Sequence, residues 1–172
     1  LGSKIEDVEK ILSDNQNNFV AQVANDNSNG QIVLSGKTKD LQILSEFLKD
    51  NKIKNIKLPV SAPFHCSLMS KATAVMTDEL QKINFKQSKN ILISNVTAEE
   101  ISNTEDLKNL LIKQIEKRVR WRESILNMIN KGVNQFIEIG PGKVLSGLVK
   151  RINKDVKIST INSEIDIKNL KI

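Results

Sequence analysis

Hydrophobic and polar positions in the first sixty residues alternate between helical and strand-like spacing. The pattern predicts a helix over 5–12, strands over 19–24 and 31–35, a helix over 38–48 and an extended segment over 56–60. The run 25–30 between the two strands is dense in turn-forming residues and predicts a hairpin. Thr38 is the expected N-cap of the second helix. With one strand added in front, this order gives the β-α-β-β-α-β pattern of a ferredoxin-like unit.

The remaining residues change rhythm and alternate longer helices with short apolar strands. The expected elements are helices over 68–83, 104–117, 121–131 and 143–152 and strands over 91–96, 135–139 and 156–161. Thr104 is the expected cap of its helix. Such alternation is typical of an α/β layer structure with parallel strands. Two or three strands cannot bury that many helices, so we expect further strands from elsewhere.

Composition limits the class of protein. A chain of 172 residues with 39% hydrophobic and 27% charged residues suits an ordinary folded domain. One cysteine and one histidine cannot form an internal disulfide or a structural zinc site, and no metal site is expected. No apolar run approaches the roughly 20 residues of a membrane helix. The chain has no initiator Met and no signal peptide, so we expect a piece of a longer protein in a reducing, cytoplasmic setting.

The formal net charge is +6, which fits a nucleic acid, an acidic protein or a phosphate-bearing ligand as partner. A lysine-rich composition with a solvated surface explains the same charge. Aromatic residues make up 3% of the chain and tyrosine is absent, which leaves few platforms for stacking bases. Nucleic-acid binding is therefore not expected.

The only histidine lies in a proline-stiffened segment. Pro59 and Pro63 precede His65, which stands just before a predicted helix. Histidine can take and return a proton near neutral pH, so His65 is a candidate general base, although a lone histidine can also be a surface or core residue. Cys66 is a candidate nucleophile, but adjacent side chains project in different directions, which disfavours a His65–Cys66 dyad.

A second candidate site is the turn Gly140-Pro141-Gly142-Lys143 between a strand and a helix. Its backbone N–H groups could bind an anion. The turn lacks the spacer and the Ser/Thr of a Walker A loop, and the alternative is a tight turn with a structural role.

Four motifs, taken in order, resemble malonyl-CoA:acyl carrier protein transacylases. They are Asn27-Ser28-x-Gly30-Gln31, Leu58-Pro59-Val60-Ser61-x-Pro63-x-His65-Cys66-x-Leu68-Met69, Gln114 followed by Val119-x-Trp121, and Ile139-Gly140-Pro141-Gly142-Lys143-Val144-Leu145-x-Gly147-Leu148. The resemblance covers essentially the whole chain. It implies a ferredoxin-like small subdomain over 1–60, lacking its first strand, and the C-terminal part of an α/β-hydrolase-like core over 61–172. The family's Gly-x-Ser-x-Gly nucleophile elbow does not occur here, and the upstream arginine that binds the malonyl carboxylate is missing as well.

The resemblance implies transfer of malonyl from CoA to the phosphopantetheine thiol of acyl carrier protein in fatty acid biosynthesis, by a ping-pong mechanism on a serine outside this chain. It implies His65 as general base and a backbone carbonyl of Gln114 as the group that orients it. It places Phe64 against the acyl pocket. It also implies that the cleft between the subdomains is lined by Asn27 and Gln31. Lys54 and the pair Lys150-Arg151 are implied as contacts to CoA or the carrier protein.

The implied protein needs no cofactor, acts as a monomer and has malonyl-CoA and acyl carrier protein as partners. The fragment alone is expected to be inactive. Two alternatives stay open from the sequence. One is a non-catalytic module that binds a carrier protein or RNA, and the other is the acyltransferase domain of a larger synthase.

Overall fold

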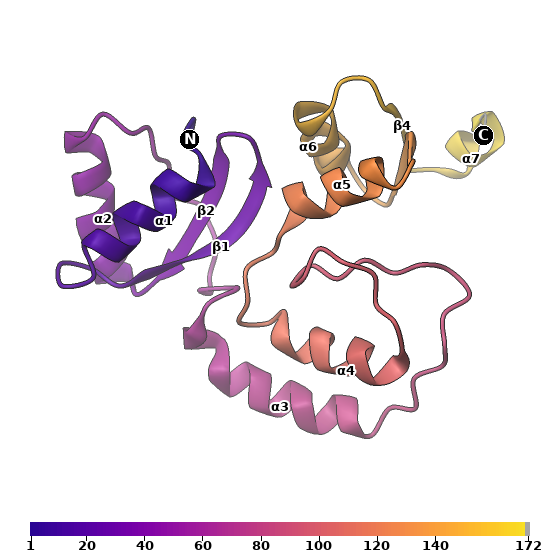
Figure 1. Cartoon of the computed structure of the whole chain (residues 1–172), viewed down its shortest axis with the longest axis horizontal. Coiled ribbons are helices and arrows are strands. Elements are labelled where there is room, and N and C mark those ends of the chain that lie inside the picture. Colours follow the sequence, from indigo (N-terminus) through magenta and orange to yellow (C-terminus); the bar gives the residue numbers. More distant parts are fainter. Residues whose placement is uncertain (171–172) are drawn as a thin grey trace. The chain divides into compact units, whose positions relative to one another are not determined.

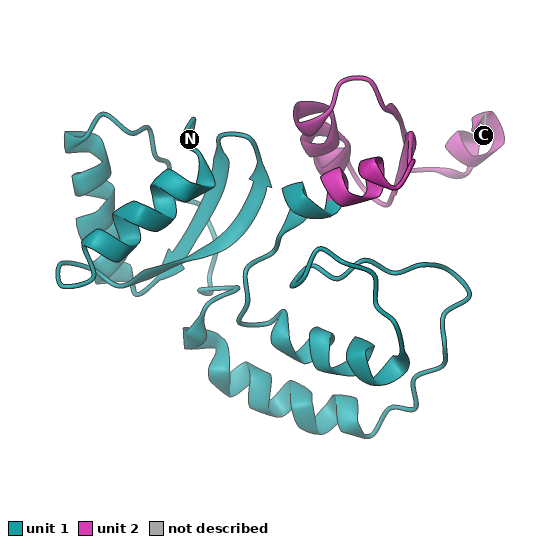
Figure 2. Ribbon diagram, viewed as in Figure 1, with its two compact units in different colours: residues 1–124 teal, residues 125–172 magenta. Residues whose placement is uncertain are grey.

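The computed structural model describes residues 1–170. The chain separates into two compact units, residues 1–124 and residues 125–172, and the boundary falls inside helix α5 (Figure 2). This division differs from the subdomain boundary expected between residues 60 and 61, which stays a prediction about the whole protein. No helix within residues 1–170 is long and apolar enough to cross a membrane.

The first unit begins with two helices and a hairpin, as the periodicity predicts (Figure 1). These elements are α1 (Ile5–Asp14), β1 (Ala21–Ser28), β2 (Gln31–Gly36) and α2 (Thr38–Asp50). The turn is shorter than expected, because β1 continues to Ser28 and the strand's buried face includes Asp26 and Ser28. Gly30 has φ +77°, a conformation that glycine adopts without steric penalty. The expected cap at Thr38 is wrong: Lys37 is the N-cap position and makes no side-chain capping bond.

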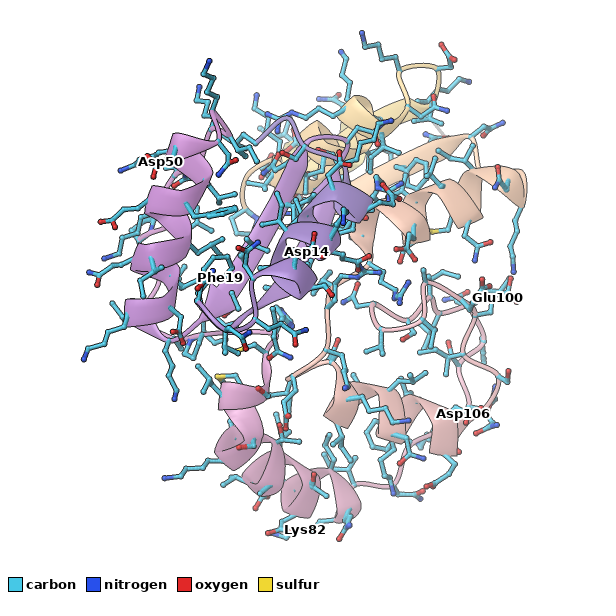
Figure 3. The ribbon with its side chains drawn as sticks, turned by 60° about the vertical axis from the view of Figure 1, so that its left-hand side comes forward. Asp14, Phe19, Asp50, Lys82, Glu100 and Asp106 are labelled. Carbon is cyan, nitrogen blue, oxygen red and sulfur yellow. The ribbon has the colours of Figure 1, made fainter. Side chains whose placement is uncertain are left out.

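Phe19 is the centre of the core of this α/β layer (Figure 3). It clusters with Leu44 and Leu48 of α2, and side chains of α1, β1 and β2 pack against the three. The ring of Phe19 lies 5.7 Å from that of Phe47, centroid to centroid. Burial of this apolar surface, rather than capping, holds both helices against the hairpin.

The middle of the chain is helical, with long irregular connections. It contains the short 3₁₀ helix η1 (Ser67–Met69), α3 (Ser70–Gln81) and α4 (Thr104–Lys113), and α3 and α4 lie side by side (Figure 1). The strand expected over 91–96 is wrong, since this segment has only an isolated bridge between Ile93 and Glu100. The segment 56–60 likewise forms no ladder. An apolar run becomes a strand only beside a neighbour that pairs with it over several residues. Within the described residues, the hydrogen bonds of 91–96 form no continuous ladder and 56–60 has no paired strand.

Helix α4 begins at Thr104 as expected, but its capping residue and its C-terminal end differ from the prediction. Asn103 caps it, because the Asn103 side chain accepts a hydrogen bond from the Asp106 backbone N–H at 2.8 Å, so the expected Thr104 cap is wrong. The helix ends at Lys113, four residues before the expected Lys117. The residues after Lys113 form the turn that matters most for the site.

The second unit is a small βαβ arrangement. Following α5 (Trp121–Asn130), strand β3 (Gln135–Ile139) pairs in parallel with β4 (Lys157–Ile161), and α6 (Val144–Ile152) connects them. The predicted strand over 135–139 and the parallel pairing are confirmed. A short helix that the pattern did not predict, α7 (Glu164–Asn169), follows β4. The α/β fold class is thus confirmed.

Candidate active site

The backbone of His65 is held in an uncommon conformation. His65 has φ +58°, in the left-handed region that non-glycine residues rarely adopt. Such a conformation costs about 1–3 kcal/mol and persists only where the surroundings fix it. Here the His65 backbone N–H donates to the Ile115 carbonyl at 3.2 Å. The prolines that precede His65 and the hydrogen bond from its own N–H together fix the backbone, and the backbone sets the direction of the side chain.

The imidazole ring makes a second contact to the same turn. Its Nδ1 lies 2.7 Å from the Gln114 carbonyl oxygen. A carbonyl only accepts hydrogen bonds, so Nδ1 carries the proton in the neutral ring and Nε2 keeps its lone pair. His65 is half-buried and lines a groove that is described below. A histidine with this tautomer can accept a proton through Nε2.

The two carbonyls that hold His65 are available because α4 ends where it does. Gln114 is the C-cap of α4, and the last carbonyls of a helix have no intrahelical partner. A helix that ran on through residue 119 would have used both oxygens inside it, in bonds from the N–H groups of residues 118 and 119. The early end of α4 thus creates the two acceptors for His65.

Residues 114–120, here termed the strap, run from the end of α4 along β1. Val119 forms a parallel bridge with Asn25: its N–H donates to the Ala24 carbonyl at 2.8 Å, and its carbonyl accepts from the Asp26 N–H at 2.9 Å. The Arg120 N–H donates to the Asn95 carbonyl at 2.8 Å. The strap is thus tied to the small α/β layer on one side and to the 91–100 segment on the other.

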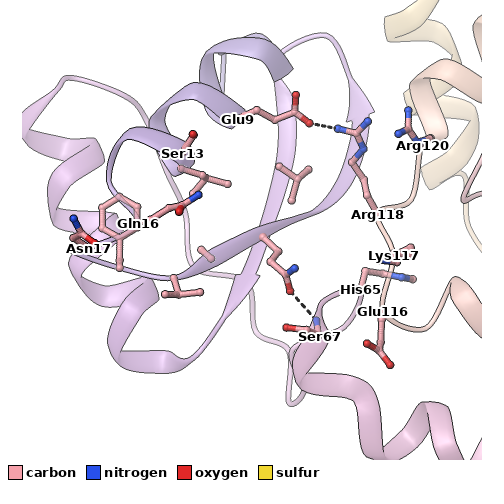
Figure 4. A pocket seen from close by; sticks show the side chains of 16 residues that line it. Glu9, Ser13, Gln16, Asn17, His65, Ser67, Glu116, Lys117, Arg118 and Arg120 are labelled. Atoms are coloured by element: carbon pink, nitrogen blue, oxygen red, sulfur yellow. Dashed lines mark hydrogen bonds and ion pairs between the residues drawn. The ribbon is translucent and has the colours of Figure 1, made fainter.

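A groove of about 770 Å³ lies beside His65 in the first unit (Figure 4). Its walls come from α1, β1 and the strap, with Glu9, Gln22 and Arg118 among the lining residues. Arg118 donates to Glu9 at 2.6 Å, and the Ser67 N–H donates to the Gln22 side-chain oxygen at 2.7 Å. Both contacts join segments far apart in sequence around the histidine.

An ion pair with a buried carboxylate joins β1 to the first turn of α5, next to the strap. The Asp26 carboxylate is 1% exposed and accepts three hydrogen bonds from Arg122, at 2.8, 3.0 and 3.1 Å. The hydrogen bonds to Asp26 hold the pKa of Arg122 above its usual range. Sequence reasoning missed this pair. The available signal was that Asp26 shares strand parity with Ala24 and Ser28, because a carboxylate on a buried face needs a cationic partner.

The other predicted site residues are dispersed. Phe64 is 51% exposed, and Lys54 is exposed with its carbonyl accepting from the Leu1 amino group at 2.7 Å. Gln31 and Lys54 line a second hollow of about 850 Å³ beside β2. Asn27 lies where the β1–β2 register shifts between Asp26 and Ser28, and such bulges are frequent near active sites. The structure therefore brings together His65 and Gln114, and none of the other four lines the groove beside His65.

Cys66 is structural. Its side chain is 1% exposed, and its sulfur donates to the Pro63 carbonyl at 3.1 Å. A thiol in this position is closed to substrates, which agrees with the expectation that His65 and Cys66 form no dyad.

At the Gly-Pro-Gly turn, acceptors of the protein itself already bind backbone N–H groups that could have bound an anion. The Glu138 carboxylate accepts from the N–H groups of Leu145 and Ser146 at 3.1 and 2.7 Å, and the Asn162 side chain accepts from Gly142 N–H at 2.6 Å. Ser146, through its side chain and then its backbone, holds the pKa of Glu138 below its usual range. Of the two interpretations of this turn, the structural one is favoured. Among residues 1–170, no group of three or more His, Cys, Asp or Glu side chains is placed to hold a metal ion.

Known proteins similar to this chain are acyltransferases. A malonyl CoA-acyl carrier protein transacylase of Bacillus subtilis is 43% identical over 157 residues, covering 88% of this chain and 50% of that protein. A solved transacylase of the same name from Clostridium perfringens is 40% identical with a TM-score of 0.91, covering 97% of this chain and 53% of that one. The resemblance to malonyl-CoA:acyl carrier protein transacylases is confirmed.

The chain spans about half the length of these transacylases. A further solved structure, described as a type II PKS acyl-carrier protein in complex with its malonyl-transacylase, is 28% identical with a TM-score of 0.91 and covers 98% of this chain and 55% of that one. No family model matches the chain.

Proposed function

We propose that the protein to which this chain contributes transfers a malonyl group from CoA to the phosphopantetheine thiol of an acyl carrier protein, and that His65 is its general base. The observation that carries this proposal is the 2.7 Å contact between His65 Nδ1 and the Gln114 carbonyl, which leaves Nε2 free to accept a proton. The similarity to transacylases over nearly the whole chain supports the choice of reaction.

The chemistry needs a nucleophile that this chain lacks. A serine hydroxyl from the remainder of the protein attacks the malonyl thioester while Nε2 of His65 takes its proton. The resulting imidazolium gives the proton to the departing CoA sulfur, which leaves a malonyl-serine ester. In the second half the carrier-protein thiol attacks this ester, and His65 takes the thiol proton and returns it to the serine oxygen. The Gln114 carbonyl accepts from Nδ1–H throughout, so the ring keeps one orientation.

The remaining roles are part of the same proposal. Phe64 bounds the acyl pocket, Asn27 and Gln31 line the cleft, and Lys54 and Lys150-Arg151 attract the phosphates of CoA or the acidic carrier protein. The ferredoxin-like subdomain and the α/β-hydrolase-like core are the proposed setting, with the missing strands supplied by the rest of the protein. The monomeric state and the cytoplasmic setting stay predictions. A purely binding module would have no need of a histidine held in one tautomer at a strained backbone.

Malonyl exchange between CoA and acyl carrier protein by the full-length protein tests the proposal. His65→Ala should lower the rate by about 10²–10⁴-fold, the typical contribution of a positioned base. Gln114→Ala is the matched control: it keeps the backbone carbonyl and removes only a side chain whose oxygen accepts from Asn95 at 3.5 Å. It should stay near the wild-type rate. Equal exchange by wild type and His65→Ala contradicts the general-base role.

A further inference from the structure

The buried Asp26 is an unusual residue for the inner face of a strand. Its carboxylate is 1% exposed, whereas its neighbours on that face are Ala24 and Ser28. Charged side chains are almost never fully buried unless they are paired. Arg122 provides the pairing in a bidentate arrangement, with Nε at 3.0 and 3.1 Å and Nη2 at 2.8 Å from the carboxylate oxygens. This geometry fixes the direction of both side chains.

Asp26 holds the neighbouring backbone as well. Its N–H donates to the Val119 carbonyl at 2.9 Å, so one residue of β1 binds the end of the strap through its backbone and the start of α5 through its side chain. The two contact points on the partner segment, Val119 and Arg122, are three residues apart. Together they prevent the segment from sliding along β1 or turning away from it.

The strap is too short to loosen at one end without moving the other. Gln114 and Ile115, whose carbonyls hold the ring and the backbone of His65, stand only five and four residues before Val119. The second side-chain tie, Arg118 to Glu9, involves a Glu9 side chain that is 54% exposed. Pairs with one exposed partner contribute little. The other charged contacts of the strap, from Arg118 and Arg120 to Glu123 at 3.2 and 2.6 Å, reach α5 and not β1, so the Asp26–Arg122 pair is the main side-chain anchor of this segment on β1.

We propose that Asp26 and Arg122 form a positioning pair that fixes the strap on β1 and thereby keeps the Gln114 carbonyl against His65 Nδ1. Neither residue touches the reacting atoms. The pair acts through the strap on the tautomer and direction of the imidazole. The catalytic part of this inference rests on the proposed role of His65 as general base, and the part concerning the ring's tautomer does not.

Three variants of the full-length protein separate positioning from stability. Arg122→Met leaves the Asp26 carboxylate buried and unpaired, Arg122→Lys keeps the charge without the bidentate fork, and Asp26→Leu/Arg122→Met removes both charges. Lys10→Gln is the control, because it breaks an exposed ion pair of α1, Lys10–Asp14, whose residues do not line the groove beside His65. Thermal unfolding measures stability, malonyl exchange gives kcat and KM, and ¹⁵N NMR reports which ring nitrogen of His65 carries the proton, with His65→Ala assigning the signals.

A positioning role predicts a specific combination of results. Arg122→Met should lose about 10- to 100-fold in kcat with KM little changed, as small misplacements of a catalytic group do. Its His65 signals should move toward a mixture of tautomers, and Arg122→Lys should recover part of both effects. The double variant should recover thermal stability without recovering kcat or the single tautomer. Lys10→Gln should resemble wild type in all three measurements.

Two results overturn the inference. The first is a double variant that recovers kcat and the Nδ1–H tautomer along with stability, which makes the pair purely structural. The second is an unchanged tautomer in folded Arg122→Lys and in the double variant, which removes the link to His65 even if Arg122→Met fails to fold. An exchange rate unaffected by His65→Ala would instead remove the proposed function, and the NMR arm would still decide the positioning of the ring.

Discussion

The His65 turn and the Gly-Pro-Gly turn have similar backbone features but differ in whether a polar group is left without a partner from the protein. Both contain a proline, both contain backbone with positive φ, and both bring backbone polar groups to one point. At His65 the protein's own groups satisfy Nδ1 and leave Nε2 open, whereas at the second turn Glu138 and Asn162 accept from the N–H groups of Gly142, Leu145 and Ser146. A polar group left available beside a groove indicates chemistry, and polar groups that pair with each other indicate a structural role.

Replacing His65 by glycine and by alanine sharpens this contrast most. Both variants should lose about 10²–10⁴-fold in malonyl exchange, since neither side chain can move a proton. At φ +58° glycine avoids the steric penalty that alanine retains, so His65→Gly should be more stable than His65→Ala by about 1–2 kcal/mol. Denaturant unfolding of the two full-length variants measures the difference. Equal stability would mean that the His65 backbone carries no strain.

Phe64 tests whether the same turn also sets acyl selectivity. Phe64→Ser should admit an α-methyl group and reduce the preference for malonyl over methylmalonyl by about 10- to 200-fold, the range for one misfitted carbon in a pocket. The ratio of kcat/KM values for the two CoA thioesters measures it. Ile167→Ser, which removes an exposed apolar side chain from the second unit, is the control and should leave the ratio unchanged. A ratio that Phe64→Ser also leaves unchanged removes Phe64 from the pocket.

The elements that could be predicted from sequence are those whose stability is local. Helices α1, α2 and α6 and strand β3 follow their periodicity, because each has an apolar face of the right spacing. The segment 91–96 has the composition of a strand and forms none, because pairing depends on a neighbour that no local pattern contains. The length of β1 was missed for a related reason, since Asn25 and Asp26 favour turns unless partners such as Val119 and Arg122 hold them in a ladder.

For the site, the sequence supplies the histidine, while the structure supplies its surroundings. Motif order led to His65 and to the Gln114 carbonyl, and the 2.7 Å contact between them is present. Nothing in the helical pattern of 104–117 indicates that α4 ends at Lys113 and frees the carbonyls that follow. The Asp26–Arg122 pair joins residues 96 positions apart, which a single sequence does not reveal.

The Gly-Pro-Gly turn should respond to substitution in stability alone. Gly140 has φ +134°, and a Cβ built there meets no atom within 4 Å, so Gly140→Ala should destabilise through backbone strain by about 1–3 kcal/mol. Gly147 lies inside α6 with equally open space, and Gly147→Ala should stabilise by about 0.5–1 kcal/mol through helix propensity. Denaturant unfolding checks both values. Malonyl exchange per folded molecule should be unchanged in each, and a selective rate loss in Gly140→Ala would assign this turn a part in the chemistry.

The smallest expected effect is the pH dependence of the same turn. The Ser146 side chain and backbone N–H lower the folded-state pKa of Glu138 below the ordinary value of 4.5. A depressed carboxylate pKa stabilises the fold above the unfolded-state pKa, and this contribution is lost as the pH falls through the folded-state pKa. Glu138→Gln should therefore unfold at a lower temperature than wild type at pH 7, and the gap should close as the pH is taken below about 4.5. A gap that stays constant between pH 7 and pH 3 would show that the charge of Glu138 is not what holds the turn on α6.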